Sequence, residues 1–355
     1  MRFHLVNFPH TQVTAEYSTS PLTDKLRKFA TMMKQRGHTV YLYAGNVTDA
    51  QCDELIECYS EEERREFQGD KHYTQLSWDS SLPIWTRFTA RVVAGIRKRA
   101  EPHDFICLSA GFSQRAIAEA LPDLTSVEYS VGYAGSFTQH RVFESYAWMH
   151  AVYGAETGGD ITKADGRWFD AVIPSFLDTQ QFSLRPKQDY YLFVGRLLDR
   201  KGYHIAIDVC RELGKPLVLA GPGTPPEGTR HVGAVGPEVR NYLMSGARAL
   251  FAPTIFLEPF GNVAIEAMAS GTPVISTDWG GYTETVVQGK TGYRCRTFDE
   301  FLRAATDAPR LDPVEIRAHA LSTYDMNVVA DTYERYFRRL ETLWGDGWYH
   351  RPSSR

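Results

Sequence analysis

The chain has 355 residues, 43% of them hydrophobic, which is long enough for two substantial cores. A formal net charge of −4 at pH 7 argues against a broadly basic nucleic-acid coat, although a local basic patch can still occur. The five cysteines are scattered and have no C-x-x-C spacing, which argues against a zinc site or a disulfide framework. The polar first strand argues against a signal peptide, and the lack of a long apolar run argues against a membrane span. We therefore expect a cytoplasmic protein.

The amino-terminal region begins with alternating strand and helix patterns. Residues 2–8 predict a strand, an amphipathic helix follows from about Thr23 to Arg36, and residues 39–45 predict a second strand. The acid-rich stretch from Asp49 to Phe67 has helical spacing. Strands alternating with helices predict an α/β fold with a Rossmann-like start.

The middle of the chain continues this alternation. We expect helices over residues 83–99, 113–121 and 142–153, and a strand over residues 104–109. Residues 170–182 combine a strand with a proline and polar turn residues. This stretch predicts a domain boundary near residue 183.

The first motif with chemical content follows a strand over residues 190–194. It reads G-R-x-x-x-x-K-G from Gly195 to Gly202 and precedes a helical pattern. Arg196 offers a planar fork to a diphosphate and Lys201 a mobile point charge. An ordinary exposed basic loop is the alternative interpretation.

The second motif reads E-P-F-G-N-V-A-I-E from Glu258 to Glu266, between a short apolar strand and a helix. Such a loop lies at the carboxyl end of a strand, where ligands collect, and the helix start directs free N–H groups outward. Gly261 and Asn262 could bring those donors close to a phosphate. The alternative is that Glu258 caps the helix and Glu266 is solvated.

Two glycine-rich turns complete the pattern, A-G-P-G at residues 220–223 and G-G-x-x-E at residues 280–284. The order of the four motifs, dense from about Tyr190 to Gly292, resembles the retaining nucleotide-sugar glycosyltransferases of family four, which have the GT-B fold. The resemblance implies two Rossmann-like domains facing across a cleft. Residues 1–183 would bind the acceptor, residues 184–326 the donor, and a final helix over residues 327–348 would pack back on the first domain.

The same resemblance implies roles for individual residues. Arg196 and Lys201 would grip the donor diphosphate, Glu258 would hold the transferred sugar, and Glu266 would bind the ribose. Catalysis would rest on Arg196, Lys201 and Glu258. The full donor set is Gly195, Arg196, Lys201, Gly221, Glu258, Phe260, Gly261, Asn262, Val263 and Glu266. The base would lie near Gly221, Val232 and residues 235–238, a UDP pocket by analogy, although nothing in these residues selects the base.

The acceptor side departs from the family pattern. No glycine-rich loop follows the first strand, and no histidine occurs in residues 126–133. The remaining candidates for acceptor contact are His10, Ser20, Tyr133, His140 and Glu144. A lone histidine is more often structural than catalytic.

The resulting hypothesis is a retaining hexosyl- or pentosyltransferase that uses a nucleoside-diphosphate sugar without a metal or other cofactor. One alternative acceptor is a hydroxymethylated base in DNA, bound by a basic series. That series comprises Arg87, Arg91, Arg97, Lys98, Arg99, Arg335, Arg338 and Arg339. Another alternative is a nucleotide-sugar-binding protein, epimerase or phosphorylase on the same fold.

Overall fold

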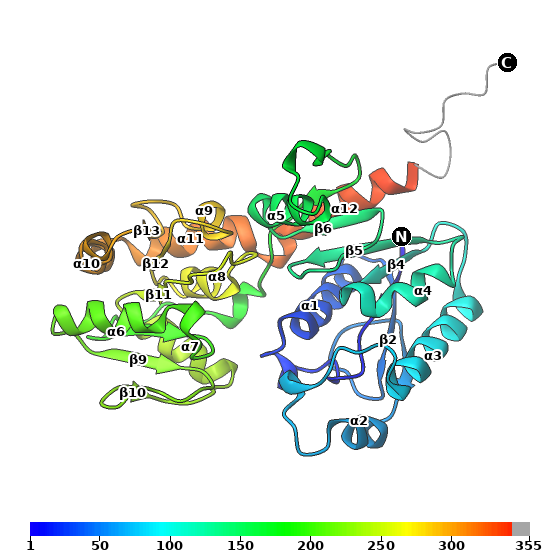
Figure 1. The fold of residues 1–355 in the computed structure, drawn as a ribbon, viewed down its shortest axis with the longest axis horizontal. Helices are drawn as coiled ribbons and strands as arrows, with labels where there is room; N and C mark the ends of the chain where they lie inside the picture. The colour runs from blue at the N-terminus through cyan, green and yellow to red at the C-terminus, as the bar shows by residue number, and fades with distance from the viewer. Residues whose placement is uncertain (343–355) are drawn as a thin grey trace. The chain divides into compact units, whose positions relative to one another are not determined.

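A computed structural model describes residues 1–342 and divides into two compact units (Figure 1). Unit 1 contains residues 1–143, 165–173 and the chain from residue 330 onward, and unit 2 contains residues 144–164 and 174–329. Each unit has its own parallel sheet flanked by helices. The predicted α/β class is therefore confirmed.

Unit 1 is built on a seven-stranded sheet with the order β3-β2-β1-β4-β5-β6-β7. All of its strand pairs are parallel. The strands are β1 (Arg2–Val6), β2 (Thr39–Gly45), β3 (Glu54–Tyr59), β4 (Phe105–Leu108), β5 (Thr125–Val131), β6 (His140–Phe143) and β7 (Ala171–Val172). The helices are α1 (Pro21–Gln35), α2 (Glu61–Gln68), α3 (Pro83–Arg99) and α4 (Arg115–Glu119), joined by most of α12 (Met326–Glu341).

Aromatic side chains fill the core of unit 1 on both faces of the sheet. Phe29 of α1 and Phe337 of α12 pack against Phe3 of β1, with ring centroids 6.2 and 4.8 Å from the Phe3 ring. Trp85 and Phe88 of α3 belong to a second cluster with alternate strand residues. Because successive side chains of a strand point to opposite faces, the two clusters lie on opposite sides of the sheet.

Two of the helices expected from the sequence are wrong over part of their length. The acidic stretch from Asp49 to Phe67 contains β3 before α2, because residues 54–59 extend the parallel sheet at its edge beside β2. The helix expected over residues 142–153 starts later, since β6 runs to Phe143 and α5 (Tyr146–Glu156) begins after Ser145. Sheet pairing overrides local helical spacing in both places.

Unit 2 contains a six-stranded sheet with the order β10-β9-β8-β11-β12-β13, again with parallel pairs. The strands are β8 (Tyr191–Val194), β9 (Leu217–Ala220), β10 (Arg230–His231), β11 (Leu250–Ala252), β12 (Val274–Thr277) and β13 (Gly292–Cys295). The helices are α5, α6 (Tyr203–Glu212), α7 (Pro237–Gly246), α8 (Asn262–Ala269), α9 (Tyr282–Thr285), α10 (Phe298–Asp307) and α11 (Pro313–Tyr324).

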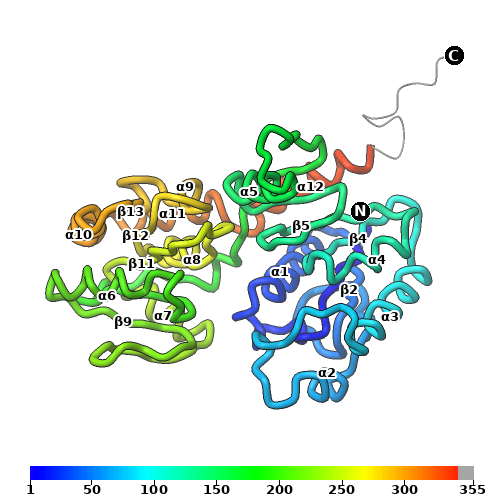
Figure 2. Tube along the Cα trace, viewed as in Figure 1, coloured from blue at the N-terminus to red at the C-terminus, as the bar shows by residue number. Residues whose placement is uncertain are grey.

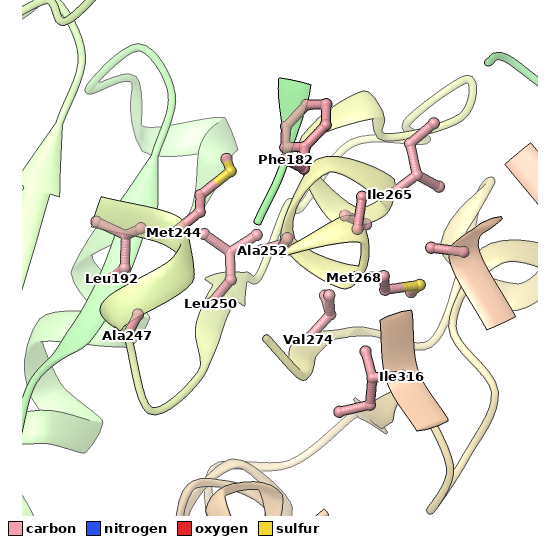
Figure 3. Close-up of a cluster of buried hydrophobic side chains, with 14 of the residues drawn as sticks. Phe182, Leu192, Met244, Ala247, Leu250, Ala252, Ile265, Met268, Val274 and Ile316 are labelled. Atoms are coloured by element: carbon pink, nitrogen blue, oxygen red, sulfur yellow. The ribbon is translucent and has the colours of Figure 1, made fainter. Parts of the chain in front are cut away.

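Helices cover both faces of this second sheet. On one face, Met244 of α7, Ile265 and Met268 of α8 and Ile316 of α11 form one buried cluster with the strand residues Leu250 and Val274 (Figure 3). Helices α6 and α10 cover alternate strand residues on the other face. Figure 2 traces the chain through the strands and helices of unit 2.

Both sheets reverse their winding direction at one place. Strand order changes direction between β1 and β4 in unit 1 and between β8 and β11 in unit 2. In open parallel sheets, ligands bind outside the carboxyl ends of the strands at such a topological switch point. The fold therefore marks one expected ligand position in each unit.

The chain crosses between the units more often than a single boundary near residue 183 would require. Residues 144–164 belong to unit 2 and residues 165–173 to unit 1. The chain crosses again between residues 173 and 174, and α12 is divided between Val329 and Ala330. The predicted final helix over residues 327–348 corresponds to α12, and residues 343–348 lie outside the described part of the chain.

Candidate active site

The carboxyl ends of β8 and β11 bring the two charged motifs of unit 2 together. Lys201, at the end of a short 3₁₀ turn after β8, places its Nζ 2.6 Å from Oε2 of Glu258. The N–H of Ile255 donates to the carbonyl of Arg200 at 2.8 Å and so joins the two loops. The two motifs are thus in contact, although 57 positions separate Lys201 from Glu258 in the sequence.

An aromatic ring supports the cationic side of this pair. The guanidinium carbon of Arg200 and the ammonium of Lys201 lie 4.6 and 4.7 Å from the centroid of the Phe256 ring. Such cation–π contacts limit where a flexible Lys side chain can move. Phe256 was missed in the sequence, where it resembles an ordinary apolar loop residue.

Arg196 occupies a different environment from Lys201. Its side chain is exposed and forms no ion pair within residues 1–342. Its loop is held against the loop after β9, because the N–H groups of Gly195 and Leu197 donate to the carbonyls of Ala220 and Pro222, both at 2.9 Å. A Cβ at Gly221 would lie 2.0 Å from the carbonyl oxygen of Gly195, so this close approach requires glycine.

The loop after Glu258 delivers the start of α8. Gly261 has φ of 91° and immediately precedes the helix, whose first N–H groups have no intrahelical partner. Asn262 and Val263 begin the helix, and Oδ1 of Asn262 has no hydrogen-bond partner among the described residues. Phe260 is only 3% exposed and belongs to the core, so its backbone rather than its ring is available to a ligand.

The second acidic residue of the motif is oriented by a residue that sequence reasoning missed. Glu266 is largely buried, and its Oε2 lies 3.4 Å from Nε of Arg240 on α7. No motif links the two positions in the sequence. The ion pair fixes the position of one carboxylate oxygen of Glu266.

The G-G-x-x-E turn supports the site from behind. The N–H of Gly281 donates to the carbonyl of Glu258 at 2.7 Å. Glu284 accepts hydrogen bonds from the N–H groups of Tyr146 and Ala147 at 3.0 and 2.9 Å, and thereby stabilises the start of α5. Ser145, which precedes that helix, donates from its Oγ to the carbonyl of Pro259 at 2.5 Å. This turn therefore positions the Glu258 loop and α5.

The candidates for acceptor contact are spread over different places. His10 is 1% exposed, and burial lowers its pKa to about 4. Ser20 caps α1, and Tyr133 donates its hydroxyl to the buried carboxylate of Glu128. His140 starts β6 level with Val127 of β5, toward the amino edge of the sheet, and burial lowers its pKa. Glu144 is half-buried in unit 2.

Carboxylates of unit 1 pair with Arg87, Arg91 and Arg99 of the basic series proposed for DNA. Glu63 pairs with Arg91 at 2.6 Å and with Arg87 at 3.4 Å. Glu54 pairs with Arg99, and the guanidinium of Arg97 donates to the carbonyl of Ala120. These contacts argue against a continuous positive groove along α3.

Two features are absent from residues 1–342. Within this range no group of three or more His, Cys, Asp or Glu side chains is arranged to hold a metal ion. No helix there is long and apolar enough to cross a membrane.

Known proteins with similar sequence and structure fit this arrangement. Residues 176–307 match the family model "Glycosyl transferases group 1". A glycogen synthase of Mycobacterium tuberculosis is 35% identical over 148 residues, which is 36% of this chain and 36% of that enzyme's length. This chain therefore aligns with about a third of the curated relative.

Solved structures match over nearly the whole chain. AviGT4, a glycosyltransferase involved in avilamycin A biosynthesis, has a TM-score of 0.68 and 21% identity and covers 96% of this chain and 98% of its own. Anabaena HepE in complex with UDP and glucose has a TM-score of 0.66 and 16% identity, with 95% and 99% covered. At these identities the likeness concerns the fold. Residues 176–307 are therefore similar to the glycosyl transferases group 1 family, and residues 1–342 have the GT-B fold of these solved structures.

Proposed function

We propose that the protein transfers a sugar, with retention of configuration and without a metal ion, from a nucleoside-diphosphate sugar to an acceptor hydroxyl. The observation that carries this proposal is the meeting of Lys201 and Glu258 at the switch point of unit 2. The exposed Arg196 lies in the same loop as Lys201, after β8. A cation and a carboxylate there suit a diphosphate and a sugar hydroxyl. UDP is a suitable carrier, since the similar Anabaena HepE was crystallised with UDP and glucose.

The proposed mechanism depends on stabilising the leaving group. As the bond between the sugar and the phosphate breaks, negative charge grows on the diphosphate, and Arg196 and Lys201 face that charge. The start of α8 adds N–H donors and the positive end of a helix dipole. A phosphate oxygen of the donor accepts the proton of the acceptor hydroxyl on the same face of the sugar, so no strong protein base is required.

The ion pair between Lys201 and Glu258 has a consequence for substrate binding. Without a donor, the two groups neutralise each other. A bound diphosphate competes for the ammonium and releases the carboxylate toward the sugar. Glu258 would then hold the sugar hydroxyls, while Glu266, oriented by Arg240, would hold those of the ribose.

A panel of nucleotide sugars tests the proposal. Hydrolysis of one of them without an acceptor, in the presence of a chelator, would support a metal-independent donor site and identify the base and sugar. Arg196→Ala should lower turnover about 100-fold or more, since one preorganised donor contributes roughly 3 kcal/mol to the transition state. The exposed Arg211→Ala, on α6, is the matched control.

The outcomes also separate the alternatives. Binding of nucleotide sugars without hydrolysis or transfer would favour a binding protein, and recovery of an epimerised donor would favour an epimerase. Turnover of Arg196→Ala equal to that of the wild type would refute the assigned role of this arginine.

A further inference from the structure

Unit 1 presents two exposed aromatic rings at its own switch point. Trp78, in the loop before α3, and Phe112, in the loop after β4, are 44% and 59% exposed. The hydroxyl of Ser113 donates to the carbonyl of Trp78 at 3.2 Å and so connects the two loops. We call Trp78 and Phe112 the aromatic edge.

The Trp78 ring is held from below by buried neighbours. Its centroid lies 4.5 Å from that of His10 and 4.8 Å from that of Phe8, and both of these side chains are buried. Nε2 of His10 bonds the carbonyl of Ser77 at 3.0 Å, which fixes the backbone beside the tryptophan. His10 was expected to contact an acceptor, but it instead packs beneath the exposed Trp78.

Phe112 is fixed in a similar way. Its N–H donates to the carbonyl of Gly135 at 3.0 Å. A Cβ at Gly135 would lie 2.9 Å from the Phe112 ring, so glycine permits this contact. A Cβ at Gly111 would lie 3.2 Å from the ring of Tyr133, another expected contact residue that acts as a support.

Polar groups line the same strand ends. The buried side chain of Gln114 accepts from the N–H of Ser109 and donates to the carbonyl of Asn7, joining the ends of β4 and β1. Within residues 1–342, Oγ of Ser109 and Oδ1 of Asn7 are buried and have no hydrogen-bond partner. Hydrogen-bonding capacity beside rigid aromatic faces is typical of small-ligand sites.

The charge around the aromatic edge favours a neutral ligand. The only basic residue in segments 76–82 and 109–115 is Arg115, which pairs with Glu119 at 2.8 Å. The nearby acid Asp79 accepts hydrogen bonds from Ser81. A nucleic-acid acceptor would need free cations for its phosphates.

We propose that the aromatic edge is the acceptor subsite and that it binds a neutral saccharide. This proposal rests on the glycosyltransferase function proposed above. The C–H face of a pyranose ring packs on the exposed Trp78 and Phe112 rings. Phe112 follows β4, and Trp78 packs on Phe8, which follows β1, so the two rings lie near the point between β1 and β4 where the strand order reverses.

Saturation-transfer NMR on the full chain tests this subsite directly. The probes are methyl α-glucopyranoside, methyl α-mannopyranoside and maltose, with a DNA duplex containing hydroxymethylcytosine in a separate arm. Trp78→Ala and Phe112→Ala should each weaken saccharide binding roughly tenfold, as for an aromatic anchor in an interface. Trp78→Tyr should restore binding, and Phe298→Ala, an exposed phenylalanine on α10, should leave it unchanged.

A second readout separates this proposal from the donor chemistry. Hydrolysis of the nucleotide sugar without an acceptor should be the same in Trp78→Ala, Phe112→Ala and the wild type. Loss of saccharide binding in these variants would support the subsite even if no nucleotide sugar were hydrolysed. The absence of hydrolysis would refute only the proposed transfer function. Equal saccharide binding in both alanine variants and the wild type, no saccharide binding at all, or binding of the duplex alone would overturn the subsite.

Discussion

At the scale of single residues, the site of unit 2 contains charges that already satisfy one another. Lys201 pairs with Glu258, and Arg240 pairs with Glu266. Removing one member of such a partly buried pair leaves the other without compensation. The two carboxylates of the motif therefore cannot be treated as isolated hydrogen-bond acceptors.

Glu258→Gln separates binding of the diphosphate from catalysis. The substitution removes the charge that competes for Lys201, so affinity for the nucleoside diphosphate should stay equal or increase. Turnover should fall about 100-fold, because the carboxylate that holds the sugar is lost. Calorimetry with UDP measures the affinity, and steady-state kinetics measures the turnover. The control is Asp199→Asn, which changes an exposed acid in the loop that carries Lys201. A parallel loss of diphosphate affinity and turnover would contradict the proposed exchange of partners.

His10 should make the stability of the protein depend on pH. Burial lowers the pKa of His10 from 6.5 to about 4, so the folded protein holds the neutral imidazole. The contribution of the neutral His10 side chain to the free energy of unfolding is complete above pH 6.5. It is lost as the pH falls toward 4, because only the unfolded state gains a proton in that window. The expected loss is about 3 kcal/mol.

Denaturant unfolding between pH 7 and pH 4 measures this effect. His10→Gln cannot take up the proton and should show a weaker pH dependence than the wild type. His204→Gln, at an exposed position on α6, should behave as the wild type does. Identical pH profiles for all three proteins would show that His10 is not responsible.

At the scale of elements, loops packed backbone to backbone hold the proposed donor site. The turn at Gly280 and Gly281 supports the loop from Glu258 to Phe260, and Glu284 joins the same turn to α5. Neither glycine is required for its chemistry. Each glycine leaves room for a neighbouring backbone segment. A Cβ at Gly280, for example, would lie 2.8 Å from the backbone nitrogen of Glu258.

Gly281→Ala tests this packing. The backbone at Gly281 has φ of −60°, which alanine accepts, but the new Cβ would lie 2.6 Å from Cα of Phe260. Displacement of the loop should raise the KM for the donor roughly tenfold, within the range of about 1–3 kcal/mol for overpacking. Gly154→Ala on α5, where a Cβ meets no neighbour, is the control. An unchanged KM would mean that the turn does not position Glu258.

At the scale of the whole molecule, the chain returns to unit 1 through α12. From Ala330 onward this helix contributes Tyr333, Tyr336 and Phe337 to the core of unit 1, and two of these residues donate hydroxyl hydrogen bonds to the carbonyls of Tyr129 and Phe169. Unit 1 therefore needs residues from opposite ends of the sequence to complete its core.

Phe337→Ala measures this dependence. Phe337 is fully buried, and its ring lies 4.8 and 4.9 Å from those of Phe3 and Phe105. Truncation should cost about 3–5 kcal/mol and lower the Tm of unit 1. Calorimetry should show this shift with donor hydrolysis retained below the transition, whereas the exposed Val328→Ala should shift nothing. An unchanged Tm would show that α12 does not stabilise unit 1.

The α/β class and the proposed donor loops of unit 2 could be predicted from the sequence alone, because they depend on contiguous residues. A strand, a turn with glycine and the start of a helix together form a local signal, as at Gly195–Gly202 and Glu258–Glu266. The expected roles of these residues in catalysis remain predictions. The expected helix over Asp49–Phe67 failed where pairing with β2, a distant segment, decided the structure.

Only the tertiary structure decided which side chains meet and which are exposed. The pairing of Glu266 with Arg240 and the support of Lys201 by Phe256 join segments with no common motif. Burial likewise made His10 a support and left Trp78 exposed beside it. The physical reason is that ion pairing, burial and close packing depend on distances between segments, whereas the periodicity of a sequence reports only the neighbours along one strand or helix.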